Sequence, residues 1–147
     1  MVVTEDSSAI LKISWSGRWG EAYIIDKALI LDASRDVRAS LQRVVGHGMT
    51  EQVQTWGGLL KDLAQKGYRL YEALFTGTGH RSDRAAQEVR DWLEDELKDE
   101  KIDIGFIIKN PGIHIPWGLI YSSKTCKLSG RDTDTQVESY EDFWCLK

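Results

Sequence analysis

The chain has 147 residues, a formal net charge of −4 and two cysteines, with 41% hydrophobic and 29% charged residues. This length predicts one domain or a large part of one, and the hydrophobic content argues against an intrinsically disordered chain. No apolar run approaches the roughly 20 residues that span a bilayer, and residues 1–6 lack the basic and apolar regions of a signal peptide. We therefore expect a cytoplasmic protein that spans no membrane.

The charge pattern argues against a nucleic-acid partner. Lysine and arginine alternate with aspartate and glutamate along most of the chain, whereas nucleic-acid-binding domains carry a basic face. Cys126 and Cys145 are too few for a disulfide framework, and the cytosol keeps thiols reduced. No Cys-x-x-Cys or His-Glu-x-x-His spacing occurs, so we predict no metal site and no cofactor.

The first part of the chain, residues 9–32, has the pattern of β-strands. Apolar and polar residues alternate with a period of two at its start, which is typical of a half-buried strand. The alternating residues are Leu11, Lys12, Ile13, Ser14 and Trp15. Residues 16–20 include two glycines and favour a turn, and residues 22–26 and 28–31 are expected to continue as strand. We predict an N-terminal β-hairpin or a three-stranded meander.

Helical periodicity follows. Asp32 or Ser34 can cap a first helix, which should stop at the Gly-His-Gly run of residues 46–48. A second helix follows, and Gly67 is expected to break it, because glycine is a poor helix former. Residues 68–75 should then form another turn or two of helix.

The clearest helix starts at Ser82, whose hydroxyl can cap it. It has one apolar stripe and one charged face, and the charged face is typical of a solvated helix surface. The stripe consists of Ala85, Val89, Trp92, Leu93 and Leu97. Residues 102–108 are largely apolar and β-branched, which predicts a buried strand. A turn should follow at Pro111 and Gly112.

The end of the chain holds a second apolar stretch over residues 113–121, interrupted by Pro116, and then a polar loop and an aromatic tail. We interpret residues 1–147 as a single domain or as the N-terminal portion of one. Its parts are a β-rich start (9–32), a mainly helical middle (34–99), and a last part (102–147) with a strand, a Pro-Trp segment and the tail.

The three histidines are weak catalytic candidates. His47 lies between two glycines, but a catalytic base needs a partner nucleophile, so we expect a helix-terminating loop. The Gly77 to His80 segment precedes a helix and suggests a nucleotide-binding regulator, but the Gly-Lys-Ser/Thr ending of a phosphate-binding loop is missing and a plain turn is expected. His114 flanks an apolar stretch and should pack at an edge.

The two cysteines are also weak catalytic candidates. Cys126 lies in a polar loop near Lys124 and Lys127, whose charges favour a thiolate, yet an exposed thiol of this kind is usually inert. Cys145 lies within the aromatic tail and suggests a small buried hydrophobic side chain. No Ser-His-Asp, Cys-His or paired-carboxylate set can be built from spacing alone, so we assign no catalytic residue.

Two segments resemble one known family. Residues 113–121, Ile-His-Ile-Pro-Trp-Gly-Leu-Ile-Tyr, resemble the Ile-Pro-Trp-Glu-Leu-Leu-Tyr signature of CHAT domains, the caspase-like peptidase family often found with TPR repeats. Residues 67–75 are similar to the family's Gly-x-x-Leu-Tyr-x-x-Leu-Phe helix, and the resemblance covers about residues 56–147. The signature residues, expected to be structural, are Ile115, Pro116, Trp117, Leu119 and Tyr121.

The resemblance implies an α/β fold with a caspase-like sheet flanked by helices, here incomplete. Gly118 stands where the family has glutamate, so any contact made by that carboxylate is absent. The family's catalytic histidine, in a His-Gly pair, and its cysteine come after the Pro-Trp segment, and this chain stops before them. The pair His47-Gly48 precedes the signature. The family members are cysteine endopeptidases, but we expect this chain alone to be inactive.

By resemblance, the chain is the N-terminal portion of a cysteine peptidase and supplies scaffold and a wall of the groove for a peptide substrate. Phe143, Trp144 and Leu146 would then form an interface with the remainder of the domain or with another chain, because exposed apolar clusters generally mark interfaces. The alternative is a non-catalytic protein-interaction module or a degenerate relative of the peptidases. The family implies a role in bacterial defence or cell death.

Overall fold

The computed structural model describes residues 8–15, 18–47, 56–77, 80–96, 104–109 and 112–122. They form a mixed α/β structure with three α-helices and a small antiparallel sheet. The chain divides into two compact units, one of residues 1–31 and 72–114 and one of residues 32–71 and 115–147. Two of the boundaries between the units fall inside helices.

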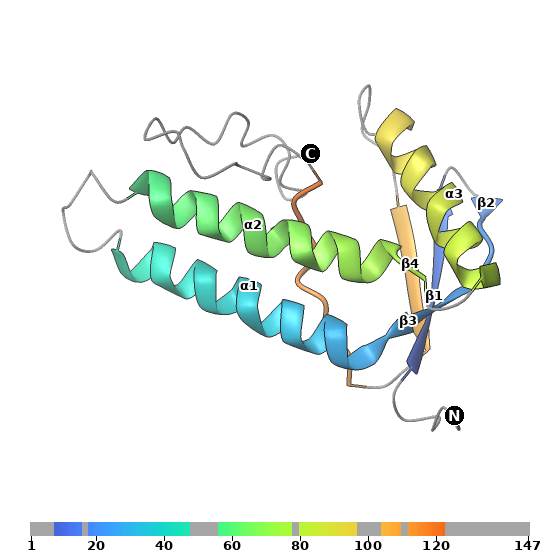
Figure 1. Cartoon of the computed structure of the whole chain (residues 1–147), viewed down its shortest axis with the longest axis horizontal. Coiled ribbons are helices and arrows are strands. Elements are labelled where there is room, and N and C mark those ends of the chain that lie inside the picture. Colours follow the sequence, from blue (N-terminus) through green and yellow to red (C-terminus); the bar gives the residue numbers. More distant parts are fainter. Residues whose placement is uncertain are drawn as a thin grey trace. The chain divides into compact units, whose positions relative to one another are not determined.

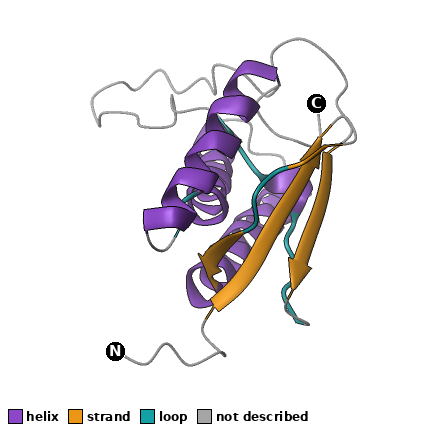
Figure 2. Cartoon of the chain, turned by 90° about the vertical axis from the view of Figure 1, so that its right-hand side faces the viewer, coloured by secondary structure: helices purple, strands orange, loops and turns teal. Residues whose placement is uncertain are grey.

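The first unit contains the sheet, which Figure 2 shows as one set of strands. Its strands are β1 (Ser8–Trp15), β2 (Arg18–Trp19), β3 (Tyr23–Asp26) and β4 (Ile104–Lys109), and every pairing is antiparallel. Ile10 of β1 pairs with both Ile24 and Lys109, so β3 and β4 occupy opposite edges of β1. β1 is therefore the central strand. The antiparallel pairing of the predicted strands is confirmed by β1 and β3, whereas Arg18 and Trp19, which were predicted to lie in the turn, form β2.

One face of the sheet forms the core of this unit. The period-two pattern is confirmed, because Leu11 and Ile13 are fully buried, as is Ile25 on β3. Helix α3 (His80–Glu96) packs against β3 and buries the predicted stripe, with Ala85, Val89 and Leu93 as its buried members. The end of the second helix is attached here as well, since the hydroxyl of Tyr23 donates to the carbonyl oxygen of Leu74 over 2.9 Å.

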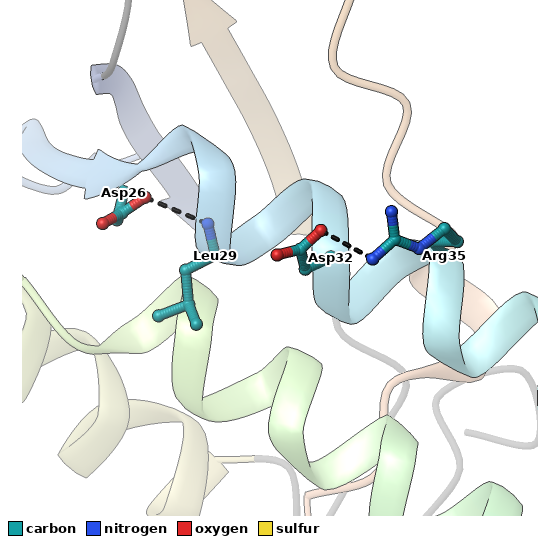
Figure 3. A network of polar contacts seen from close by, with 4 residues as sticks. All are labelled: Asp26, Leu29, Asp32 and Arg35. Atoms are coloured by element: carbon teal, nitrogen blue, oxygen red, sulfur yellow. Dashed lines mark hydrogen bonds and ion pairs between the residues drawn. The ribbon is translucent and has the colours of Figure 1, made fainter.

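Two predictions about this unit are wrong. The stretch 28–31 is helical, because α1 runs over Lys27–His47 and follows β3 directly. The carboxylate of Asp26 accepts a hydrogen bond from the backbone N–H of Leu29 over 3.0 Å and thus caps this helix, in place of Asp32 or Ser34 (Figure 3). β4 was expected to be buried, but the side chain of Ile107 is 42% exposed, because Ile107 lies on the face of the sheet opposite the buried Leu11 and Ile13.

The second unit contains α1 from Asp32, helix α2 (Trp56–Phe75) up to Tyr71, and residues 115–122. The two helices lie side by side (Figure 1). α1 ends at His47, as the glycines around it predict. The core of the unit consists of Ala33, Val37, Leu63, Ala64, Tyr68, Leu70, Tyr71, Ile120 and Tyr121.

The expected helix break at Gly67 is also wrong, because α2 continues through it without interruption. A helix tolerates one glycine at a cost of about 1 kcal/mol, and here packing requires the missing side chain. By contrast, the predicted turn at Gly112 agrees with its φ of +106°, a conformation that glycine adopts without strain.

Candidate functional site

The two segments that carry the family resemblance lie against each other in the second unit. A Cβ atom placed on Gly67 would collide with the backbone carbonyl oxygen of Leu119. It would also lie 3.0 Å from the Cβ atom and 3.1 Å from the backbone nitrogen of Tyr121. The backbone of α2 therefore contacts the backbone of the Pro-Trp segment directly, which only glycine permits. We call this contact the Gly67 seam.

A short 3-10 helix, η2 (Trp117–Leu119), brings the Pro-Trp segment to the seam. The backbone N–H of Leu119 donates to the carbonyl oxygen of Pro116 over 2.9 Å, and the N–H of Ile120 donates to that of Trp117 over 3.1 Å. Pro116 has φ −79°, as its ring requires, and it precedes this turn. The turn leads directly into Ile120 and Tyr121, both buried.

The predicted signature residues differ in burial. Tyr121 is buried, whereas Ile115, Pro116, Trp117 and Leu119 are half-buried. The sequence did not single out Ile120. Its side chain is fully buried, whereas that of its predicted neighbour Leu119 is only half-buried. The only feature of the sequence that could have indicated the burial of Ile120 was its position between a turn and a tyrosine. These residues form a structural contact and present no reactive group to solvent.

The facing helix adds two stacked tyrosines. The rings of Tyr68 and Tyr71 are 5.9 Å apart between centroids, with 23° between their planes, and both side chains are buried. Offset stacking at this distance is favourable for aromatic rings. Tyr68 follows Gly67 directly and Tyr71 belongs to the family-like helix pattern, so the segment that resembles the family is also the most aromatic part of this core.

A polar cluster between α1 and α2 was missed by the sequence analysis. The buried hydroxyl of Ser40 donates to the Oδ2 atom of Asp62 over 2.6 Å, and the guanidinium of Arg43 donates to the same atom over 2.8 Å. One carboxylate thus joins the two helices. No spacing rule connects residues this far apart in sequence, because their contact exists only after the helices pack.

The three histidines lie on different parts of the described chain. His47 is the last residue of α1 and is half-buried, and His114 follows β4 and is exposed. His80 is the first residue of α3. Cys126, Cys145 and the predicted interface of Phe143, Trp144 and Leu146 lie outside the described residues.

Two searches over the described residues gave negative results. In this part of the chain no helix combines the length and the apolar character needed to cross a membrane. Nor do its histidines, cysteines and carboxylates form a group of three or more that could hold a metal ion. Comparisons with family models, with curated proteins and with solved structures found no match.

Proposed function

We propose that this chain supplies the N-terminal portion of a CHAT-like, caspase-like cysteine peptidase domain and acts as its scaffold. In this proposal it works in the cytoplasm, contributes a wall of the substrate groove, and has no catalytic dyad of its own. The process it serves is bacterial defence or cell death. The motif residues of segments 67–75 and 113–121 are the basis for the family assignment.

One observation carries the proposal. Each of the two segments resembles a motif of the family in sequence, and the two segments lie against each other at the Gly67 seam. Gly67 is the first residue of one motif, and Leu119 and Tyr121 belong to the other. If the two resemblances had arisen by chance, nothing would require the segments to touch, or the contact to fall on the one position of the helix motif that is glycine.

The chemistry assigned to the whole domain is attack of a cysteine thiolate on a peptide carbonyl. A histidine acts as base and backbone amides stabilise the oxyanion. Such a site needs its reacting groups held within fractions of an ångström, which rigid packed elements provide. The role of this chain is to hold α2 and the Pro-Trp segment in one fixed arrangement, and residues outside this sequence supply the thiol and the imidazole.

Reconstitution tests this proposal. The coding sequence after the codon for Lys147 and the neighbouring genes are read for a segment with a His-Gly pair and a later cysteine, which is then produced together with this chain. We expect fluorogenic peptides to be cleaved only when both are present. Gly67→Leu should reduce cleavage at least tenfold, while Gly58→Leu, at a position of the same helix with nothing within 4 Å, should leave it unchanged.

Two results would contradict the proposal. The first is cleavage by this chain alone that is lost in Cys126→Ala or Cys145→Ala. The second is the absence of any encoded partner segment, which would favour the alternative of a non-catalytic interaction module. That alternative has its own support in the exposed apolar side chains on the uncovered face of the sheet, including Trp19 and Ile107.

A further inference from the structure

The uncovered face of the sheet carries a connected set of apolar side chains. Residues directly opposite each other on antiparallel strands point to the same face. The pairs Ile10–Ile24, Lys12–Ile107, Ser14–Trp19 and Ile10–Lys109 therefore share the face opposite Leu11 and Ile13. We define the outward face as Ile10, Lys12, Trp19, Ile24, Ile107 and Lys109.

The apolar members of the outward face are unusually exposed for their size. Ile10 is 41% exposed, Trp19 50%, Ile24 42% and Ile107 42%. They come from all four strands of the sheet, so they form one patch and are not isolated surface residues. A contiguous apolar patch of this kind marks an interaction site in soluble domains.

The charges on the outward face indicate which charge a partner should carry. The ammonium of Lys12 lies 5.4 Å from the centroid of the Trp19 ring, and Lys109 is exposed and makes no ion pair within the described part of the chain. The carboxylate of Asp26, at the end of β3, is engaged by the backbone N–H of Leu29. The two charged side chains that define the outward face are therefore positive, although the chain has a net charge of −4, and the carboxylate of Asp26 lies at the edge of the same face beside Ser8.

We infer that the outward face binds an acidic amphipathic helix of a partner protein. Three adjacent strands at about 4.8 Å spacing give a strip roughly 10 Å wide, which matches the diameter of one helix. The opposite face already packs against an amphipathic helix, α3, through its apolar stripe. A carboxylate beside the apolar stripe of the partner would reach Lys12 or Lys109. This inference holds whichever function the whole chain has.

A second copy of this chain is a poorer occupant. In a two-fold symmetric contact the same patch meets itself. Lys12 and Lys109 would then lie near the same lysines of the second copy, and their positive charges would repel each other. An acidic partner avoids this repulsion. The partner chemistry that fits the outward face is therefore an apolar stripe flanked by glutamate or aspartate.

Two synthetic peptides test the inference. Both are fluorescein-labelled 18-residue helices with the same leucine stripe, and their remaining positions are glutamate in one and lysine in the other. Anisotropy titration with the full chain should show the glutamate peptide binding at least tenfold more tightly. Ile24→Ser with Ile107→Ser should weaken binding at least tenfold, while Val45→Ser, at an exposed apolar position of α1, should not change it.

Charge reversal provides a variant that keeps the apolar residues. Lys12→Glu with Lys109→Glu should reverse the preference toward the lysine peptide, with circular dichroism melting as the check on folding. Failure of both peptides to bind, equal binding of both, or binding that survives the serine substitutions would overturn the inference. A dimer in light scattering that Ile107→Glu dissociates would also overturn it, in favour of self-association.

Discussion

Gly67 lies so close to Leu119 that a single added methyl group would collide with the carbonyl oxygen of that residue. This explains why a glycine stands inside a 20-residue helix at a position where the sequence alone predicts a break. Glycine at this position allows the Pro-Trp segment to approach the helix backbone, and it destabilises the helix only slightly.

Substitution Gly67→Ala should destabilise the protein. Overpacking against backbone costs about 1–3 kcal/mol, and alanine regains about 1 kcal/mol of helix propensity. We expect a net loss of up to about 2 kcal/mol in the free energy of unfolding measured with urea. Gly58→Ala is the matched control, because it lies in α2 with nothing within 4 Å. The control should gain up to about 1 kcal/mol, and an equal gain at Gly67 would exclude the seam.

Asp62→Ala should lower stability by about 1–3 kcal/mol, because it leaves the buried hydroxyl of Ser40 without its acceptor. The double variant Ser40→Ala with Asp62→Ala should recover part of this loss. In contrast, the pair of Arg43 with Asp62 is partly exposed, so its coupling should stay below about 1 kcal/mol. Double-mutant cycles measure the coupling energies of Ser40 with Asp62 and of Arg43 with Asp62. A larger coupling energy for Arg43 than for Ser40 would contradict the prediction.

Ser34→Ala should be neutral or stabilising by up to about 1 kcal/mol. The Ser34 hydroxyl is buried in α1 and forms no hydrogen bond with any residue that the structure describes, so its removal relieves a desolvation cost. Alanine is also the better helix former. Thermal melting provides the measurement, and a loss of more than about 1 kcal/mol would show that this hydroxyl has a partner.

Asp26→Ala should cost about 1 kcal/mol, with a loss of helicity at the start of α1, because its carboxylate accepts from the N–H of Leu29. Asp32→Ala serves as the comparison in the same helix, since the ion pair of Asp32 with Arg35 lies on the surface (Figure 3). That comparison should change stability by no more than about 0.5 kcal/mol. Equal effects of the two substitutions would argue against capping by Asp26.

The sequence predicted the elements whose burial follows one clear period. The alternation around Leu11 and Ile13 gave β1, and the stripe of Val89 and Leu93 gave α3, because one face of each element is buried and the other is not. Residues 28–31 were predicted wrongly as strand. A short continuous apolar run has no period, so it fits a buried strand and a helix equally well, and the deciding cap at Asp26 precedes the run.

The candidate site was predicted only in part. The Pro-Trp segment was singled out from the sequence, but its contact with α2 was not predicted, because the role of Gly67 depends on a backbone contact between distant segments. The Ser40–Asp62 contact was missed for the same reason. Local patterns carry information on which face of an element is buried, and they carry none on which distant backbone will lie against it.

The most direct test of the account is a measurement of the Gly67 seam in solution. With resonances assigned for this 16.7 kDa chain, nuclear Overhauser spectra report which pairs of protons lie close together in space. We predict strong cross-peaks from the α-protons of Gly67 to the β-protons and the amide proton of Tyr121, because a Cβ atom placed on Gly67 would lie only 3.0 Å from the Cβ atom and 3.1 Å from the nitrogen of Tyr121. Assigned resonances without these cross-peaks would show that α2 and the Pro-Trp segment do not pack together, and would contradict the proposed scaffold.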